Sequence, residues 1–264
     1  MSLAPDAPVI AVLGLGEAGS LLARDLLDAG AAVRGYDPAL PSPAGLAGQP
    51  GFTVTRSEAE AAAGATLVLS VNSSKAALGA FEAAIPAIAA GTAWADLNTA
   101  SPGLKRQLAT LGDRHAIPVT DIAMMAPVPG RGLKVPMLAS GDAAVTAALL
   151  ARLGASVEVL DGPAGLAATR KLLRSVFYKG MATSIVEALE AARAAGLEDW
   201  LHEHIGAELA KSDLATVDRI VAGTSQHAVR RGAEMAAAAA MLTELGVPPL
   251  MADASRAVHE RLAP

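Results

Sequence analysis

The apolar positions of the chain follow two different patterns, and the change between them falls near residue 163. Before that point, short apolar runs alternate with segments in which apolar residues recur at helical spacing. The runs are predicted to be strands at 9–13, 32–36, 66–71, 92–97, 119–122, 135–139 and 157–160. The intervening helices are expected at about 17–29, 74–90, 101–112 and 142–153, with Asp142 as the N-cap of the last. Strands of this kind, separated by helices, indicate a parallel sheet covered on both faces.

Beyond the turn Asp161-Gly162-Pro163, only the helical pattern remains. From 164 to 195 there is no proline and there are only two glycines, and Gly196 is the expected C′ residue of this long helix. Further helices are expected at the following positions: 199–210, 213–221, 226–245 and 249–262. The sequence therefore predicts a doubly wound α/β domain over 1–163 and an all-helical domain over 164–264.

Composition narrows the class of protein. Hydrophobic residues make up 52% and charged residues 18% of the 264 residues, so a large core can form and disorder is not expected. The formal net charge of −5, with no run of Lys or Arg, argues against a nucleic-acid-binding surface. Cysteine is absent, which excludes disulfides, thiolate zinc sites and thiol nucleophiles and is compatible with a reducing compartment. We expect no metal site.

The N-terminal region is not expected to direct the chain to a membrane. It contains Asp6 and lacks a basic segment, which argues against a signal peptide. The apolar stretch 9–27 is interrupted by Glu17, Arg24 and Asp25, so it is not expected to cross a bilayer. The sequence therefore indicates a soluble, cytoplasmic protein with neither a membrane nor a nucleic acid as its partner.

A glycine-rich turn follows the first predicted strand. The run Gly14-Leu15-Gly16-Glu17-Ala18-Gly19 has the pattern G-x-G-x-x-G and opens a helix that Gly30 ends. In this context Gly14 allows a tight turn, Gly16 lets the backbone approach a pyrophosphate, and Gly19 lets helix and strand pack closely. The helix N-terminus offers free N–H groups to the phosphates. The run therefore predicts a dinucleotide site; the alternative is a glycine-rich turn in an unrelated α/β protein.

An acidic residue stands at the expected place for the ribose. Asp37 follows the second predicted strand, 21 residues after Gly16. Its carboxylate can accept hydrogen bonds from the ribose hydroxyls and would repel a 2′-phosphate, and no Arg follows it in the next four residues. The sequence therefore favours NAD as the cofactor, with NADP as the alternative.

Two further strand ends are expected to line the cofactor, since ligands of such sheets lie outside the carboxyl ends of the strands. One is Val71-Asn72-Ser73. The other contains Asn98 and Thr99, which could meet the nicotinamide ribose or carboxamide. Each of these side chains could instead belong to an ordinary polar loop.

Three segments resemble a known family, in addition to the glycine-rich turn. They are Asp96-Leu97-Asn98-Thr99-Ala100-Ser101-Pro102, which is similar to D-x-S-T-x-x-P; Asp161-Gly162-Pro163-Ala164-Gly165, which leads to Lys171; and Glu187-Ala188-Leu189 with Gly196-Leu197, which matches a K…EA…GL helix. Over nearly its whole length the chain resembles the β-hydroxyacid dehydrogenase superfamily, which includes 3-hydroxyisobutyrate and 6-phosphogluconate dehydrogenases. The resemblance implies a Rossmann domain followed by an all-α domain of the 6-phosphogluconate dehydrogenase C-terminal type.

The same resemblance places Lys171 at the position of the family's catalytic lysine. Oxidation of an alcohol requires a base for the hydroxyl proton, and a lysine can serve when desolvation or nearby positive charge lowers its pKa. Judged by the residues alone, Lys171 is one polar residue on a long helix and a solvated face would explain it. Because Lys171 coincides with the family's lysine in the matching segments, the resemblance instead implies that Lys171 acts as a general acid–base.

The chain departs from the family pattern at the substrate. Ser175 stands where the family has an Asn, and Met125-Ala126-Pro127 stands where it has a Ser-Gly-Gly loop for a carboxylate. Pro127 and Pro129 lack N–H groups and cannot replace that loop. Here the chain resembles a little-characterised branch whose second domain has no assigned role. We expect Met124 and Met125 to line the substrate pocket together with Ser175.

Four basic residues have an open role. Lys179 lies two helical turns beyond Lys171, where it could hold an anionic group of the substrate or donate a proton; a lysine that extends past an apolar surface is the simpler explanation. His227, Arg230 and Arg231 could reach an active site, and a surface role is favoured for them.

The combined prediction is an NAD(P)-dependent dehydrogenase or reductase of a small hydroxy or keto compound, with its cleft between the domains. The long Ala-rich helix offers more apolar surface than one domain buries, so a homodimer is expected. An imine or enone reductase is the second hypothesis, because the chain lacks the loop that binds a substrate carboxylate in the family. A non-catalytic dinucleotide-binding sensor is the third; it would tolerate Lys171→Ala but not Gly16→Val.

Overall fold

The structure, a computed structural model, describes residues 7–41, 43 and 45–264. The chain divides into two compact units, residues 1–174 and 175–264, and the division falls within the long helix α6 (Leu166–Ala194). The predicted domain boundary at residue 163 stays a prediction. In the described ranges no helix is long and apolar enough to cross a membrane.

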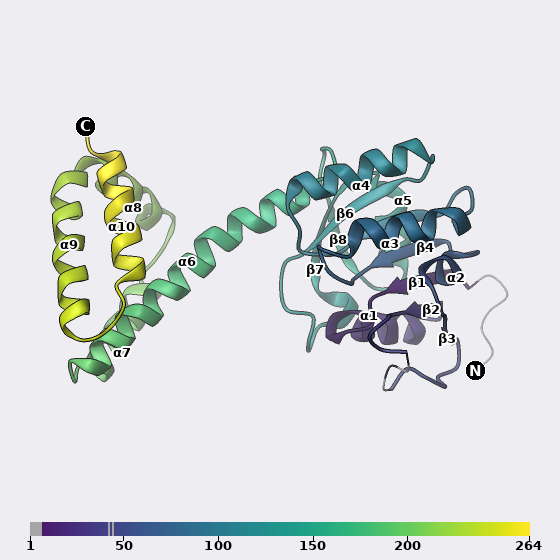
Figure 1. Ribbon diagram of the computed structural model, residues 1–264, viewed down its shortest axis with the longest axis horizontal. Helices are drawn as coiled ribbons and strands as arrows, with labels where there is room; N and C mark the ends of the chain where they lie inside the picture. Colours follow the sequence, from purple (N-terminus) through teal and green to yellow (C-terminus); the bar gives the residue numbers. More distant parts are fainter. Residues whose placement is uncertain (1–6, 42, 44) are drawn as a thin grey trace. The chain divides into compact units, whose positions relative to one another are not determined.

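The first unit contains one sheet with helices on both of its faces (Figure 1). The described strands lie in the order β3-β2-β1-β4-β5-β6-β7-β8. Their bounds are β1 Val9–Leu13, β2 Ala32–Tyr36, β3 Phe52–Val54, β4 Leu67–Ser70, β5 Ala93–Asp96, β6 Val119–Met124, β7 Pro136–Gly141 and β8 Ser156–Val159. The helices are α1 Glu17–Asp28, α2 Glu58–Ala62, α3 Ala77–Ala84, α4 Pro102–Arg114 and α5 Ala143–Arg152. The predicted doubly wound α/β fold is confirmed.

The sheet is buried on both faces because the side chains of a strand point alternately to opposite sides. On β1, Ile10 and Val12 pack in the cluster that contains Leu22 of α1, whereas Leu13 packs in the cluster that contains Phe81 of α3. These strands are therefore continuously apolar, which is why strict alternation is missing from the sequence.

The predicted parallel sheet contains one antiparallel pairing, beyond which β7 and β8 run opposite to the other described strands. β7 runs antiparallel to β6, with Met124 opposite Met137. Two neighbouring strands can be parallel only if a crossover connects them, and the segment 125–135 holds only a short 3-10 turn, Gly132–Lys134. The chain therefore turns back directly, and parallel pairing resumes between β7 and β8 across α5.

Two smaller expectations are met only in part, and two short elements were not expected. Asp142 occupies the N-cap position of α5, but its side chain makes no capping hydrogen bond. The helix expected at 74–90 is a shorter α3 followed by a 3-10 turn, Ile85–Ala87, because Pro86 has no N–H for a helical hydrogen bond. β3 and α2 were not expected, since three and five residues are too few for a periodic signal.

The second unit is entirely helical in the residues described. After α6 come α7 Glu198–Ala210, α8 Leu214–Gln226, α9 Ala228–Glu244 and α10 Leu250–Leu262, of which α9 and α10 pack side by side (Figure 1). The predicted helices are confirmed, with α8 extending five residues further than expected. Gly196 has φ +72°, and its N–H donates to the Arg193 carbonyl, so it is the predicted C′ residue of α6.

Candidate active site

The three glycines of the first turn have different environments. Gly14 has φ +98°, and a Cβ added there would lie 2.6 Å from the Asn72 Cα. A Cβ on Gly19 would overlap the carbonyl oxygen of Gly14. A Cβ on Gly16 would meet no atom within 4 Å. Gly14 and Gly19 are therefore needed to build the turn, whereas Gly16 leaves an exposed stretch of bare backbone.

That bare backbone leads into the N-terminus of α1. Gly16 is the N-cap residue and no side chain caps the helix, so the first-turn N–H groups have no side-chain acceptor. Gly16 and Glu17 are exposed, Ala18 is half-buried, and the Leu15 side chain is buried in the core. An uncapped helix N-terminus beside an accessible backbone suits the oxygens of a pyrophosphate.

Asp37 lies directly beside this turn. Its Oδ2 accepts a hydrogen bond from the Leu15 N–H at 2.8 Å, and its Oδ1 accepts one from the Ala39 N–H at 2.9 Å. The carboxylate is thus held in one orientation at the end of β2. Burial raises the pKa of the neighbouring Tyr36 phenol, and Glu58 and Asp37 raise this pKa further, so Tyr36 is a neutral phenol near pH 7.

The two polar strand ends predicted to line the cofactor lie together. Ser70 at the end of β4 is the register partner of Asp96 at the end of β5. The Asn98 Nδ2 donates to the Asn72 Oδ1 at 2.9 Å and to the Ser70 Oγ at 3.0 Å. Asn72 also accepts from the Ser73 N–H at 2.6 Å. Val71, Asn72 and Ser73 are therefore joined to the segment that carries Asn98 and Thr99.

Lys171 lies at the same edge of the sheet. It is half-buried and lines a narrow hollow, too tight to hold a water molecule, together with Asn98 and Thr99. All three belong to the first unit. The structure thus brings the expected proton-transfer residue next to two of the residues expected at the nicotinamide.

The residues expected to bind substrate lie at the end of β6 and on α6. Met124 and Met125 are half-buried at the end of β6, and the Met125 N–H donates to the Pro136 carbonyl at 2.8 Å. Ser175 and Lys179 lie on α6 in the second unit, where Ser175 is half-buried and Lys179 is exposed. Their roles stay predictions.

Two of the three basic residues near the start of α9 contact residues close to them in the sequence. His227 is the N-cap residue of α9 and is exposed. Arg230 forms an ion pair with Glu234, and the Arg231 Nη1 donates to the Thr224 Oγ1 at 2.9 Å. The surface role favoured by the sequence remains the simplest interpretation.

Sequence reasoning missed a cluster of buried charges that adjoins the hollow, which Asp121 of this cluster also lines. Lys105 of α4 is 1% exposed, and its Nζ lies 2.6 Å from the Asp96 Oδ1 and 3.0 Å from the Asp121 Oδ1. A signal existed: Lys105, Leu108 and Gly112 form the buried face of α4, so the lysine occupies a position expected to be apolar. A lysine there needs an anionic partner, which the sequence does not name.

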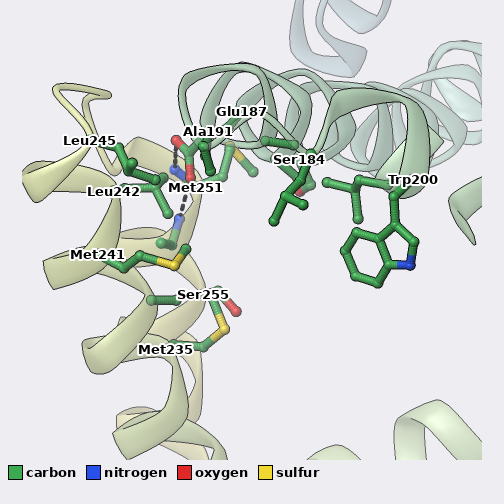
Figure 2. Close-up of a pocket in the computed structure, with 17 residues that line it drawn as sticks. Ser184, Glu187, Ala191, Trp200, Met235, Met241, Leu242, Leu245, Met251 and Ser255 are labelled. Carbon is green, nitrogen blue, oxygen red and sulfur yellow. Dashed lines mark hydrogen bonds between the residues drawn. The ribbon is translucent and has the colours of Figure 1, made fainter.

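A second missed feature is an apolar cavity of about 520 Å³ within the helical unit (Figure 2). Its walls include the following large side chains: Trp200, Met235, Met241, Leu242, Leu245 and Met251. At one side Glu187, 9% exposed, accepts hydrogen bonds from the Met251 and Ala252 N–H groups at the start of α10. Glu187 belonged to a family marker in the sequence, but its function as a helix cap required the structure.

Comparison with known proteins agrees with this layout. Residues 9–155 match the model of the NAD binding domain of 6-phosphogluconate dehydrogenase. The chain belongs to this family. Residues 192–262 match a domain of unknown function, DUF1932. The chain thus carries an NAD-binding domain of the oxidoreductase type, which confirms the expected cofactor class and the branch with an unassigned second domain.

Three relatives illustrate the similarity. An uncharacterized 28.5 kDa protein from Methanothermus fervidus is 27% identical over 158 residues, which cover 60% of this chain and 61% of that protein, less than two thirds of its length. A conserved protein of unknown function, described as structurally similar to 3-hydroxyacid dehydrogenases, is 27% identical with a TM-score of 0.63, covering 96% of each chain. An imine reductase from Myxococcus stipitatus in complex with NADP+ is 18% identical with a TM-score of 0.80, covering 96% of this chain and 93% of that one, and shares its fold.

Proposed function

We propose that this protein is an NAD-dependent oxidoreductase that interconverts a small hydroxy compound and its keto counterpart, with Lys171 as general acid–base. The observation that carries the proposal is the hollow at the sheet edge, which Lys171 lines together with Asn98 and Thr99. In sheets of this type ligands bind outside the carboxyl ends of the strands, and both residues 98 and 99 follow such an end.

The residues of the first turn fit the cofactor. The exposed backbone at Gly16 and the uncapped N-terminus of α1 would hold the pyrophosphate, and Asp37 would accept from a ribose hydroxyl. The negative charge of Asp37 disfavours a 2′-phosphate and supports NAD over NADP. The bound cofactor would accept or supply the hydride.

Lys171 would handle the proton. In oxidation, its neutral amine accepts the proton of the substrate hydroxyl while the carbon loses its hydride. In reduction, its ammonium returns a proton to the carbonyl oxygen. Asn98 would help to position the substrate, because its amide nitrogen shares its two hydrogens among three acceptors, on Ser70, Asn72 and Asp96.

Imine reduction is the second candidate, and one observation favours it. The loop expected to hold a substrate carboxylate has few free amides, since the Met125 N–H is bonded to the Pro136 carbonyl and Pro127 has none. A substrate without a carboxylate would suit these surroundings. Similarity in fold to an imine reductase is compatible with both candidates.

We also propose a homodimer formed through the helical unit. α8 exposes Leu214, Val217 and Val221, at 76%, 54% and 63%, spaced i, i+3 and i+7 along one helix face. An apolar stripe of this kind is typical of an interface. We expect analytical ultracentrifugation to give a dimer, and a monomer for the double variant Val217→Asp/Val221→Asp; a monomeric parent protein would contradict this.

The proposed activity can be tested in two stages. Titration calorimetry should show NADH binding more tightly than NADPH, and no binding of either at millimolar concentration would refute the proposal. A panel of hydroxy acids, keto acids, alcohols and cyclic imines should then identify a substrate through oxidation or reduction of the cofactor. NADH binding without turnover of any compound would favour the sensor hypothesis.

The role of Lys171 needs a matched pair of variants. Lys171→Met should lower kcat by roughly 10²- to 10⁴-fold and leave the NADH dissociation constant unchanged, because acid–base catalysis contributes a factor of that size. Lys211→Met removes an exposed lysine of the helical unit and should leave kcat unchanged. Full activity of Lys171→Met would refute the assignment.

A further inference from the structure

The buried charges form a compact cluster between two strands and a helix. Asp96 on β5 and Asp121 on β6 are direct register partners, and the Lys105 ammonium lies between their carboxylates. The three side chains are at most 1% exposed. Two neighbouring carboxylates would repel each other in the core, and the ammonium compensates that repulsion.

Asp121 uses its second oxygen to hold the start of α6. The Asp121 Oδ2 accepts from the N–H groups of Gly165 and Ala168, each at 3.0 Å. Both amides lie at the N-terminus of α6, where no intrahelical acceptor exists. Lys171 follows Ala168 by three residues on the same helix. The orientation of this first turn therefore sets the place from which the Lys171 side chain extends.

Asp96 uses its second oxygen to orient Asn98. The Asp96 Oδ2 accepts from the Asn98 Nδ2 at 2.8 Å. An ionised carboxylate can only accept, so the NH₂ group of Asn98 must face it, and the amide oxygen is directed elsewhere. Asn98 is 7% exposed and lines the hollow with Lys171.

We infer that Asp96, Lys105 and Asp121 are the positioning residues of this site. Asp121 positions Lys171 through the first turn of α6, Asp96 positions Asn98, and Lys105 is their shared counter-ion. The inference rests on the proposed function in one respect, the role of Lys171 in proton transfer. Well-packed apolar residues in place of a buried ion pair often stabilise a fold equally or more, so stability alone does not account for the cluster.

Asp121→Asn is the informative variant. A carboxylate has two accepting oxygens, one for Lys105 and one for the α6 amides, whereas the carboxamide has only one. Its NH₂ group must face either the ammonium or the helix amides, and all of these are donors. One of the two contacts is therefore lost, while Asp96 and Lys105 remain a neutral pair. Ser140→Ala is a milder variant: it removes a hydroxyl that donates to the Asp121 Oδ2 and accepts from the Ala167 N–H, and it changes no charge.

The first measurement needs no substrate. Lysine amines are labelled with acetic anhydride at fixed pH, and mass spectrometry compares the rate at Lys171 with the rate at Lys179 on the same helix. We expect the ratio of the rates to change severalfold in Asp121→Asn and in the same direction, but less, in Ser140→Ala. An unchanged ratio in both variants would overturn the inference, whatever the protein's substrate proves to be.

The second measurement is a double-mutant cycle on kcat, with the substrate that the panel identifies. A small displacement of a reacting group can cost up to roughly 100-fold, so Asp121→Asn should lower kcat by up to that factor with the NADH dissociation constant unchanged. In the Lys171→Met background, Asp121→Asn should lower kcat no further, because the lysine that Asp121 positions has been removed. Equal losses in both backgrounds would overturn the inference. No loss from Lys171→Met alone would instead refute the proposed function.

A control separates positioning from general instability. Thr120 is buried on β6 next to Asp121, and its hydroxyl donates to the Asp142 carbonyl at 2.8 Å. Thr120→Val should lower the midpoint of unfolding and leave kcat and the labelling ratio unchanged. If Thr120→Val reproduced the changes seen in Asp121→Asn, the cluster would be merely structural.

Discussion

Gly16→Ala should weaken cofactor binding without weakening the fold. Gly16 has φ −62° and ψ −165°, an extended conformation that any residue can adopt. A Cβ at this position meets no protein atom within 4 Å. Replacing glycine by alanine at such a position stabilises a protein by about 0.4–1 kcal/mol, because the unfolded chain loses freedom. The unfolding midpoint without ligand should therefore stay the same or rise slightly.

The effect on binding has the opposite sign. The methyl group would occupy the bare surface that we assign to the pyrophosphate, and unrelieved overpacking costs roughly 1–3 kcal/mol. That corresponds to a dissociation constant for NADH about five- to 150-fold higher. At an NADH concentration 100 times the parent's dissociation constant, the ligand stabilises the parent protein by about 2.7 kcal/mol and a 100-fold weaker variant by only about 0.4 kcal/mol.

Calorimetric titration and thermal denaturation with and without NADH measure both effects. Gly19→Ala is the contrasting variant: its Cβ would overlap the Gly14 carbonyl oxygen, so it should lose stability even without cofactor. Gly180→Ala adds a methyl group in open space on α6, so it should leave NADH binding unchanged and raise the unfolding midpoint slightly. If Gly16→Ala bound NADH as tightly as the parent protein, the pyrophosphate would not pass over this backbone and the reasoning would fail.

Two other substitutions test separate parts of the molecule. Asp37→Asn removes the negative charge but keeps an acceptor for the Leu15 N–H. The preference for NADH over NADPH should therefore fall by about fivefold or more, since one like-charge contact costs about 1 kcal/mol or more. An unchanged ratio of the two dissociation constants would show that Asp37 does not contact the ribose. Glu187→Ala leaves the Met251 and Ala252 N–H groups without their acceptor and should lower the free energy of unfolding by about 1–3 kcal/mol, measured by urea denaturation, with Glu187→Gln intermediate. Equal stability of all three proteins would mean that solvent replaces this cap.

Most of the secondary structure could be predicted because it depends on local properties of the chain. A buried strand such as β1 is a continuous apolar run, and α6 is a long run without proline that ends at a glycine able to adopt φ +72°. The glycine-rich turn was recognisable for the same reason: Gly14 has φ +98°, and a Cβ on Gly19 would overlap the carbonyl oxygen of Gly14, five residues before it. The reversed direction of β7 was not predictable in this way, since it depends on the path of a connection without a covering helix.

The residues of the candidate site likewise fall into those that the sequence indicated and those that only the structure revealed. Residue type and spacing indicated Gly16 and Asp37, because their chemistry suits a dinucleotide wherever the chain carries them in that order, and the family resemblance indicated Lys171. Only the tertiary structure decided that Lys105 lies between Asp96 and Asp121, three residues whose partners come from two strands and a helix. A charge can be buried only where opposite charges surround it, and that condition is a property of packing, which the order of residues along the chain does not specify.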